Sequence, residues 1–176
     1  GRESAIKQLR THGEDLSGIV LDNSMLKNLQ FIDTKLSNAS FINAKLEDVK
    51  FDKSKIYEAS FQNAELRKAQ FHNAILNDID FIGAVVTDAN FEQACLKCCY
   101  GDSSTYFNGS IFRNASISYS EFRKTNFNNT QFDKSNLVEV VLNDCCMYRS
   151  CLNEANWSHV EGHSLKLLLA EANNFK

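Results

Sequence analysis

Proline is absent from this 176-residue sequence, and glycine occurs only seven times. Because these two residues mark turns and flexible linkers, their scarcity argues against a loop-rich fold and against several domains joined by linkers. No apolar run approaches the roughly 20 residues that a membrane-spanning helix needs. The first 15 residues, GRESAIKQLRTHGED, also lack the apolar segment of a signal peptide. We therefore expect one domain that does not insert into a membrane.

A strong excess of one charge is also missing. The chain has 19 Lys and Arg against 22 Asp and Glu, which gives a formal net charge of -3. Such a balance gives no bulk attraction to nucleic acid, so direct nucleic-acid binding is not expected. The six cysteines occur in the clusters CLKCC and CCMYRSC, without the wide spacing of a secreted disulfide framework. These features favour a reducing, cytoplasmic location.

What the sequence has instead is a period of five. Residues 59–76 read ASFQNAELRKAQFHNAIL, with a large apolar residue every fifth position and alanine two places before each. An amphipathic helix repeats every 3.6 residues and a half-buried strand every two, so neither explains the pattern. The apolar frame runs from Leu16 to Leu96, fails in KCCYGDSSTY, and resumes one residue late from Phe107 to Trp157.

Several repeats carry a fuller triplet of a small residue, asparagine and a large apolar centre: ANF at 89–91, TNF at 125–127, SNL at 135–137 and ANW at 155–157. Over about residues 14–160 the sequence resembles the pentapeptide-repeat family. The resemblance implies an all-β fold, a right-handed quadrilateral β-helix in which four repeats complete one coil. Residues 14–160 then form about seven coils, with an interruption at 97–106.

If four repeats make a coil, residues twenty apart stack. The interruption preserves this register when it is counted as one repeat plus one extra residue. Two opposite sides are then aromatic and the alternate pair is aliphatic. The predicted structural core contains nine phenylalanines: Phe31, Phe51, Phe71, Phe91, Phe41, Phe61, Phe81, Phe112 and Phe132.

The ends of such a stack would leave apolar coils facing water, so caps are expected. Residues 1–13 are predicted to form an N-terminal helical cap that begins after Ser4 and ends at Gly13. Residues 161–176 are predicted to form a C-terminal helical cap or dimerisation segment. There Ser164 starts the helix, and Leu165, Leu168 and Leu169 share one face. The second segment is alternatively the start of a further domain.

No residue pattern points to catalysis, a metal or a cofactor. Cys95 and Cys98 have CxxC spacing, but the second cysteine cluster lies about fifty residues away on other sides of the expected coil, so a four-ligand zinc site is not expected. The four histidines fall at outward or terminal positions, and the glycines form no phosphate-binding loop. We therefore predict a protein that is not an enzyme.

The outward positions are the remaining place for function. Ile42 and Ile82 point outward on one side, two coils apart, and Glu58 and Asp78 begin an acidic ladder. These four residues are the candidate surface for a protein partner. We predict a protein-interaction scaffold, in line with the resemblance to repeat modules of bacterial effectors that are delivered into host cells.

The alternative is a resemblance to family members that protect DNA gyrase and confer quinolone resistance, whose acidic rod imitates DNA. Such mimicry implies a continuous negative stripe, whereas basic residues interrupt the acidic ladders of this sequence. A purely structural rod is a third interpretation. A second copy of the chain, bound through the C-terminal segment, is a further expected partner.

Overall fold

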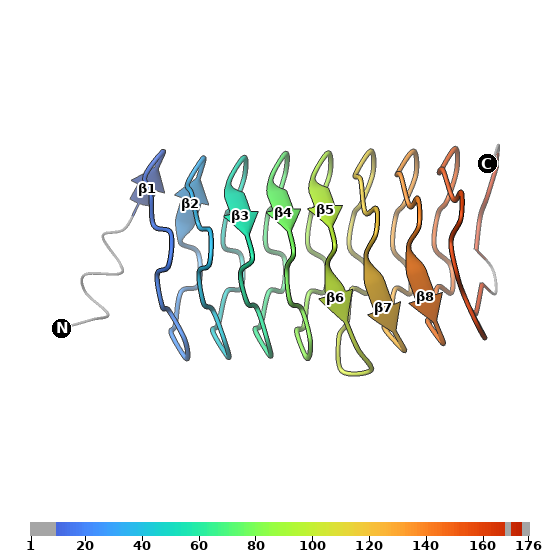
Figure 1. The fold of residues 1–176 in the computed structure, drawn as a ribbon, viewed down its shortest axis with the longest axis horizontal. Helices are drawn as coiled ribbons and strands as arrows, with labels where there is room; N and C mark the ends of the chain where they lie inside the picture. Colours follow the sequence, from blue (N-terminus) through green and yellow to red (C-terminus); the bar gives the residue numbers. More distant parts are fainter. Residues whose placement is uncertain (1–9, 168–169, 174–176) are drawn as a thin grey trace.

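The computed structural model describes residues 10–167 and 170–173. The chain winds into a long rod of similar coils that lie side by side (Figure 1). All regular elements of the described residues are short strands: β1 (Arg10–His12), β2 (Gln30–Ile32), β3 (Lys55–Tyr57), β4 (Ile75–Asn77), β5 (Cys95–Lys97), β6 (Tyr100–Gly101), β7 (Glu121–Arg123) and β8 (Val141–Asn143).

Neighbouring coils pair in parallel at a spacing of twenty residues. In the sheet β3–β4–β5, Ile56 lies opposite Leu76, and Leu76 lies opposite Leu96. Isolated parallel bridges with the same spacing recur every five residues, as in Val20–Ser40 and Met25–Lys45. Each coil therefore has four sides, and the described residues make about eight coils of a parallel β-helix. The right-handed sense of winding stays a prediction.

We number the sides by their central residues. Side I carries Phe31 and Phe51, side II Leu36 and Ile56, side III Phe41 and Phe61, and side IV Leu46 and Leu66; all eight are buried. The residue before each centre forms the bridge to the next coil and points outward. The small residue two places before each centre points inward, and Ala44, Ala64 and Ala84 are 0% exposed there.

A tight turn follows most centres. The N–H of Ala44 donates to the carbonyl of Phe41 at 3.0 Å, and Asn43 between them has a φ of 56°. A positive φ at this place is the mark of a type II turn. The same conformation recurs two residues after almost every centre, at 26 non-glycine residues and four glycines of the described chain. Proline cannot adopt this conformation and has no N–H for the ladders between coils, which excludes it from most positions of the repeat.

Aromatic rings stack along the interior. The ring centroids of Phe71 and Phe91 lie 4.7 Å apart with planes 3° from parallel, and Phe112 continues this stack at 4.7 Å from Phe91. The stack of side III meets that of side I edge to face, as between Phe41 and Phe51 at 5.7 Å and 81°. The structure buries all nine phenylalanines that the sequence predicts for the core.

The interruption is absorbed inside the rod. Asp80 pairs with Tyr100 twenty residues on, but Val85 pairs with Tyr106 at a distance of 21, and Tyr106 pairs with Asn126 again at twenty. One extra residue is therefore inserted between Tyr100 and Tyr106. Gly101 occupies the side III centre of this coil, and residues 102–105 form the enlarged turn.

The predicted helical caps are wrong for the part of the chain that the structure describes, which contains no helix. Arg10–His12 is strand β1, paired with β2. At the other end Glu161, Lys166 and Glu171 bridge to the preceding coil, and Ser164 occupies a turn with a φ of 55° instead of a helix start. The hydrogen-bonding row of the neighbouring coil outweighs local helix propensity at both ends. Residues 1–9, Leu168 and Leu169 lie outside the described residues.

Candidate interaction surface

The corner between sides II and III joins two outward rows. One row lies two residues after each side II centre, and the other lies one residue before each side III centre. The backbone sets both rows: the N–H of Asp78 donates to the carbonyl of Lys97 at 2.8 Å, and Tyr100 pairs with Glu121 across β6 and β7. From the third described coil onward the rows are Glu58, Asp78, Cys98, Tyr119, Glu139 and His159, and Ser60, Asp80, Tyr100, Glu121, Val141 and Glu161. We call these two rows the acidic corner.

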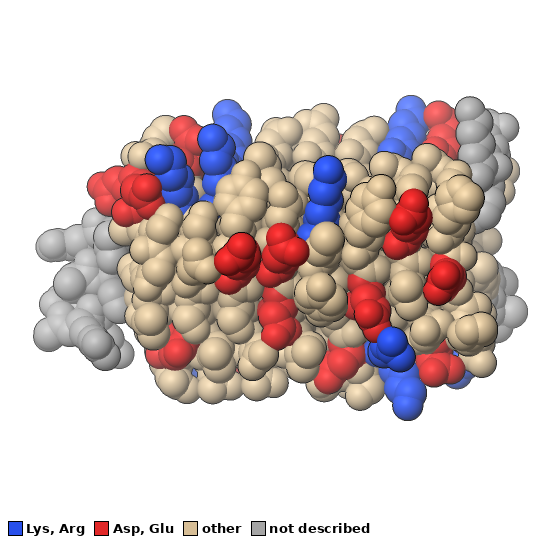
Figure 2. Space-filling model, in the orientation of Figure 1, with Lys and Arg blue, Asp and Glu red and all other residues tan. Residues whose placement is uncertain are grey.

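The acidic corner carries six carboxylates and, within its two rows, neither lysine nor arginine. Figure 1 shows β3–β5 and β6–β8 on the near side of the rod, and Figure 2 shows acidic side chains along the middle of this near face, with basic ones mostly toward its margins. Basic residues flank the corner: Lys55 and Lys97 on side II, and Arg123 and Lys124 on side III. Arg123 is ion-paired with Glu121.

The predicted residues Glu58 and Asp78 lie in this corner, in adjacent coils. Sequence reasoning missed Asp80, Glu121 and Glu161, because it followed each ladder along one side and did not join ladders that meet at a corner. The signal was available: Asp78 and Asp80 are two residues apart in the sequence, on either side of the inward residue Ile79.

Exposed aromatic residues lie within the same corner. Tyr100 is 45% exposed and Tyr119 is 54% exposed. On the adjoining part of side III, the predicted residue Ile82 is 40% exposed, whereas its predicted companion Ile42, two coils away, is half-buried. The structure thus places Ile82, but not Ile42, beside the carboxylates and the tyrosines.

Some outward carboxylates and amides also have a structural role. At several centres the next N–H faces outward, and an Asp or Asn side chain accepts its hydrogen bond. Asp80 Oδ1 accepts from Ile82 N at 2.8 Å within one coil, whereas Asp52 Oδ1 accepts from His72 N at 3.0 Å in the next. This gives a physical reason for the Asp and Asn preference of the repeat.

The enlarged turn beside Tyr100 is held by one carboxylate. Asp102 Oδ1 accepts from Ser104 N at 3.0 Å, from Ser104 Oγ at 2.7 Å and from Thr105 Oγ1 at 3.1 Å. It also accepts from Gly83 N in the preceding coil at 3.3 Å. Partial burial opposes ionisation, but these hydrogen bonds outweigh it and lower the pKa of Asp102. The turn is therefore tied both to itself and to its neighbour.

The cysteines occupy separate places. Cys99 and Cys145 are buried at small-residue positions, and their thiols donate to the carbonyls of Leu76 and Phe122 at 3.2 Å. Burial raises the pKa of Cys99 far above its usual range and that of Cys145 to about 12. Cys95 and Cys98 are half-buried thiols. Among the described residues no three His, Cys, Asp or Glu side chains are grouped so that they could hold a metal ion.

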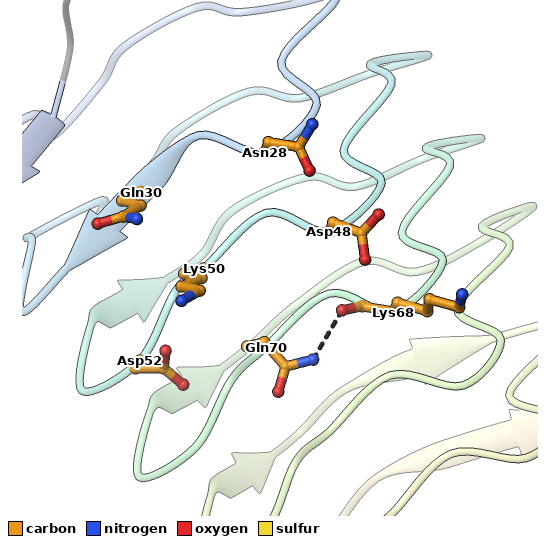
Figure 3. A pocket seen from close by; sticks show the side chains of 7 residues that line it. All are labelled: Asn28, Gln30, Asp48, Lys50, Asp52, Lys68 and Gln70. Carbon is orange, nitrogen blue, oxygen red and sulfur yellow. Dashed lines mark hydrogen bonds between the residues drawn. The ribbon is translucent and has the colours of Figure 1, made fainter.

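Two surface hollows complete the description. The larger, of about 720 Å³, lies at the corner between sides IV and I (Figure 3), where Gln70 Nε2 donates to the carbonyl of Lys68 at 2.7 Å. Figure 3 shows its lining as two parallel rows from neighbouring coils: Asn28, Asp48 and Lys68, then Gln30, Lys50 and Gln70, with Asp52 beside them. Its mixed charges match no catalytic arrangement. The smaller, of about 360 Å³, lies on the acidic corner and is lined by Glu139, Val141, His159 and Glu161.

The described part of the chain has no helix that is long and apolar enough to cross a membrane. The repeat geometry agrees with the comparison to protein families. A model described as pentapeptide repeat region matches residues 34–109, and one described as pentapeptide repeats (8 copies) matches residues 15–52 and 120–156. The chain belongs to the pentapeptide-repeat family. The resemblance drawn from the sequence is thereby confirmed.

Solved structures of other pentapeptide-repeat proteins are similar to this one. A trypsin-treated variant of QnrB1, a plasmid-mediated fluoroquinolone resistance protein, has a TM-score of 0.71 and 14% identity, over 92% of this chain and 90% of that chain. Full-length QnrB1 has a TM-score of 0.53 and 16% identity, over 92% and 78% of the two chains. HetL from the cyanobacterium Nostoc has a TM-score of 0.39 and 19% identity, over 97% and 92%. A comparison with curated proteins finds no match. At these identities the likeness to QnrB1 shows the fold alone.

Proposed function

We propose that this pentapeptide-repeat rod is a non-enzymatic scaffold that binds a protein partner through the acidic corner. The observation that carries the proposal is the combination, on one corner, of six carboxylates with two tyrosines that are about half exposed. Exposed aromatic side chains inside a charged rim are typical of protein interfaces, in which tyrosine is enriched.

The rod supports this role because it is rigid. Every coil donates hydrogen bonds to the next, so rows of outward side chains are held at the strand spacing of about 4.8 Å. A partner that binds the corner orders little backbone, and association therefore loses little conformational entropy.

The test compares two matched charge reversals. Glu58→Lys with Asp78→Lys changes the acidic corner. Asp48→Lys with Asp88→Lys changes the corner between sides IV and I, at the same turn position and with the same positive φ. Labelled protein is used to capture partners from bacterial and host-cell lysates. We expect proteins that wild type and the control variant capture equally and the corner variant loses. Equal capture by all three contradicts the proposal.

Binding to a topoisomerase is the second candidate function, and the carboxylates of the acidic corner favour it. Their density argues against imitation of DNA. Six carboxylates over about six coils give roughly one charge per 5 Å, whereas duplex DNA carries one per about 1.7 Å. We expect no protection of DNA gyrase from a quinolone at micromolar protein in a supercoiling assay. Dose-dependent rescue that Glu58→Lys with Asp78→Lys abolishes would make topoisomerase protection the leading function.

Location and assembly are further parts of the proposal. The scaffold works in the cytoplasm or, as in the bacterial effectors that its repeats resemble, after delivery into a host cell; a translocation reporter fused to the chain distinguishes the two. Pairing with a second copy through residues 161–176 is tested by sedimentation of the full chain. A monomer at all concentrations contradicts that pairing.

A further inference from the structure

The two exposed tyrosines of the acidic corner lie next to each other across coils. Tyr100 pairs with Glu121, and the N–H of Cys98 donates to the carbonyl of Ser118 at 3.3 Å. Tyr119 therefore lies one coil beyond Cys98 and two positions before Glu121 along the chain. The two rings occupy opposite rows of the same corner in adjacent coils.

Carboxylates lie on both sides of this tyrosine pair along the rod. Asp78 and Asp80 lie one coil before Tyr100. Glu121 lies in the coil of Tyr119, and Glu139 lies one coil after it. Arg123 is engaged with Glu121. A partner that approaches the rings thus meets negative charge in both directions along the corner.

This arrangement is complementary to cations. The face of a tyrosine ring attracts an ammonium or guanidinium group, and arginine also stacks its planar group on aromatic rings. Single-stranded nucleic acid stacks on tyrosines as well, but carboxylates repel its phosphates. The chemistry favours a basic polypeptide over a nucleic acid.

We propose that Tyr100 and Tyr119 bind an arginine- and lysine-rich segment of a protein partner, with its cations over the rings and its neighbouring charges paired with the carboxylates of the acidic corner. The inference rests on the proposed function and names the chemistry of the partner. It differs from imitation of DNA, because the aromatic rings and not a dense row of charges form the centre of the site.

The probe is a fluorescein-labelled peptide of alternating arginine and serine, and its affinity for the protein is measured by fluorescence anisotropy. A glutamate–serine peptide is the charge control. Tyr100→Ala with Tyr119→Ala is expected to weaken binding about fivefold to tenfold, because two ring faces are lost. Tyr100→Phe with Tyr119→Phe is expected to stay within about twofold of wild type, because phenylalanine keeps the ring face.

Tyr106→Ala is the matched control. Tyr106 is 42% exposed and occupies the same position of the repeat as Tyr100, but on side IV. It is expected to leave peptide affinity unchanged. Circular dichroism verifies that each variant is folded, and the phenylalanine pair remains informative if an alanine variant is not.

Four results would overturn the inference. These are no binding of the basic peptide, equal weakening of binding by Tyr106→Ala, phenylalanine variants that bind as weakly as the alanine ones, or tighter binding of a labelled oligothymidylate than of the basic peptide.

Failure of the proposed function would be seen separately. If the lysate experiment yields no corner-dependent partner but the peptide depends on the tyrosine pair, the inference stands. If capture of partners depends on Glu58 and Asp78 but peptide affinity does not change in the tyrosine variants, the inference alone is wrong.

Discussion

Residues 31–96 and residues 97–147 fill the interior of one rod in different ways. In the first region, side III carries Phe41, Phe61 and Phe81, and side IV carries only aliphatic centres. In the second, the side III centre is Gly101, followed by Phe122 and Leu142. Side IV now carries Phe107 and Phe127. From the coil that holds the extra residue onward, aromatic centres thus appear on side IV, while side III keeps only Phe122.

The difference teaches that the interior has to be filled, but that the side which supplies the large residue can change from coil to coil. A Cβ on Gly101 would lie 2.8 Å from Cδ1 of Phe122, so that ring fills the space which a larger centre would take. Phe107 meets Phe81 at 5.5 Å and Phe122 at 5.7 Å, both edge to face. Ring contacts therefore continue through the coil that lacks a central side chain.

The largest expected effect breaks the regular region. Phe71→Asp places a carboxylate between Phe51 and Phe91, whose ring centroids lie 4.9 and 4.7 Å from that of Phe71. Loss of the buried ring and burial of a charge without a partner cost at least about 4 kcal/mol, which we expect to unfold the rod. Circular dichroism and urea titration measure it, with Phe71→Leu as the control. An unchanged melting temperature would contradict the stacked register.

The next effect tests whether the second region has spare room. Gly101→Ala is expected to destabilise the protein by about 1–3 kcal/mol through overpacking against Phe122. Combining it with Phe122→Leu relieves the contact, so the double variant is expected to be more stable than the two single effects added together predict. Urea titration of the wild type, the two single variants and the double variant measures the coupling free energy between the two positions. Strict additivity would mean that Phe122 does not fill the space at Gly101.

A smaller effect concerns the enlarged turn that separates the two regions. Asp102→Ala removes the shared acceptor of Ser104, Thr105 and Gly83 and is expected to cost about 1–2 kcal/mol at pH 7. Because the pKa of Asp102 is lowered in the folded protein, its contribution is present above its unfolded pKa and is lost as the pH falls through its folded value. The stability difference between wild type and variant should therefore shrink on titration from pH 7 to below about pH 4. A pH-independent difference would exclude the charged form as its source.

Removal of metal ions is expected to have no effect on stability. Cys95, Cys98 and Cys99 lie in the coil that contains the enlarged turn, and a metal bound there would stabilise the junction of the two regions. We expect chelator treatment to leave the melting temperature unchanged and elemental analysis to find no stoichiometric zinc. Native Cys99 should also resist alkylation, because burial keeps its thiol protonated. A metal-dependent melting transition would reverse this interpretation.

The five-residue frame made the coil and its register predictable, because the centres alone determine which residues stack. Phe31 over Phe51, and Phe91 over Phe112 across the interruption, follow from counting by twenty and from one extra residue. The end structures did not follow from local rules. Ser164 satisfies the pattern of a helix start, yet it lies in a turn of the rod. There the N–H groups of Asp144 and Met147 in the preceding coil donate to the carbonyls of His163 and Lys166 at 2.7 and 2.8 Å, and a helix at this end would leave both N–H groups without these acceptors.

Two features needed knowledge of the turns. The residue two positions after each centre varies in type along the sequence, yet it adopts a positive φ even where it is Lys53 or Glu58. Asparagine and aspartate make up half of the non-glycine residues at these positions, and that enrichment was the available signal. The acidic corner was missed for a related reason. Asp78 and Asp80 belong to different sides, and only the turn between them brings their two rows together.

The register of twenty has a consequence for how such a chain can change in length during evolution. A duplication of twenty residues adds one whole coil and leaves every later residue on its own side. A gain of five keeps the hydrophobic frame, and so the fold, but turns everything after it by a quarter of a revolution. Glu121 and Glu161 would then leave the line of Asp80, and the surface would be scrambled while the core stayed intact. Fold and surface thus tolerate different insertions. Within the described residues, the stretch between Tyr100 and Tyr106 shows that the rod can accept a single added residue and resume its pairing at a spacing of twenty.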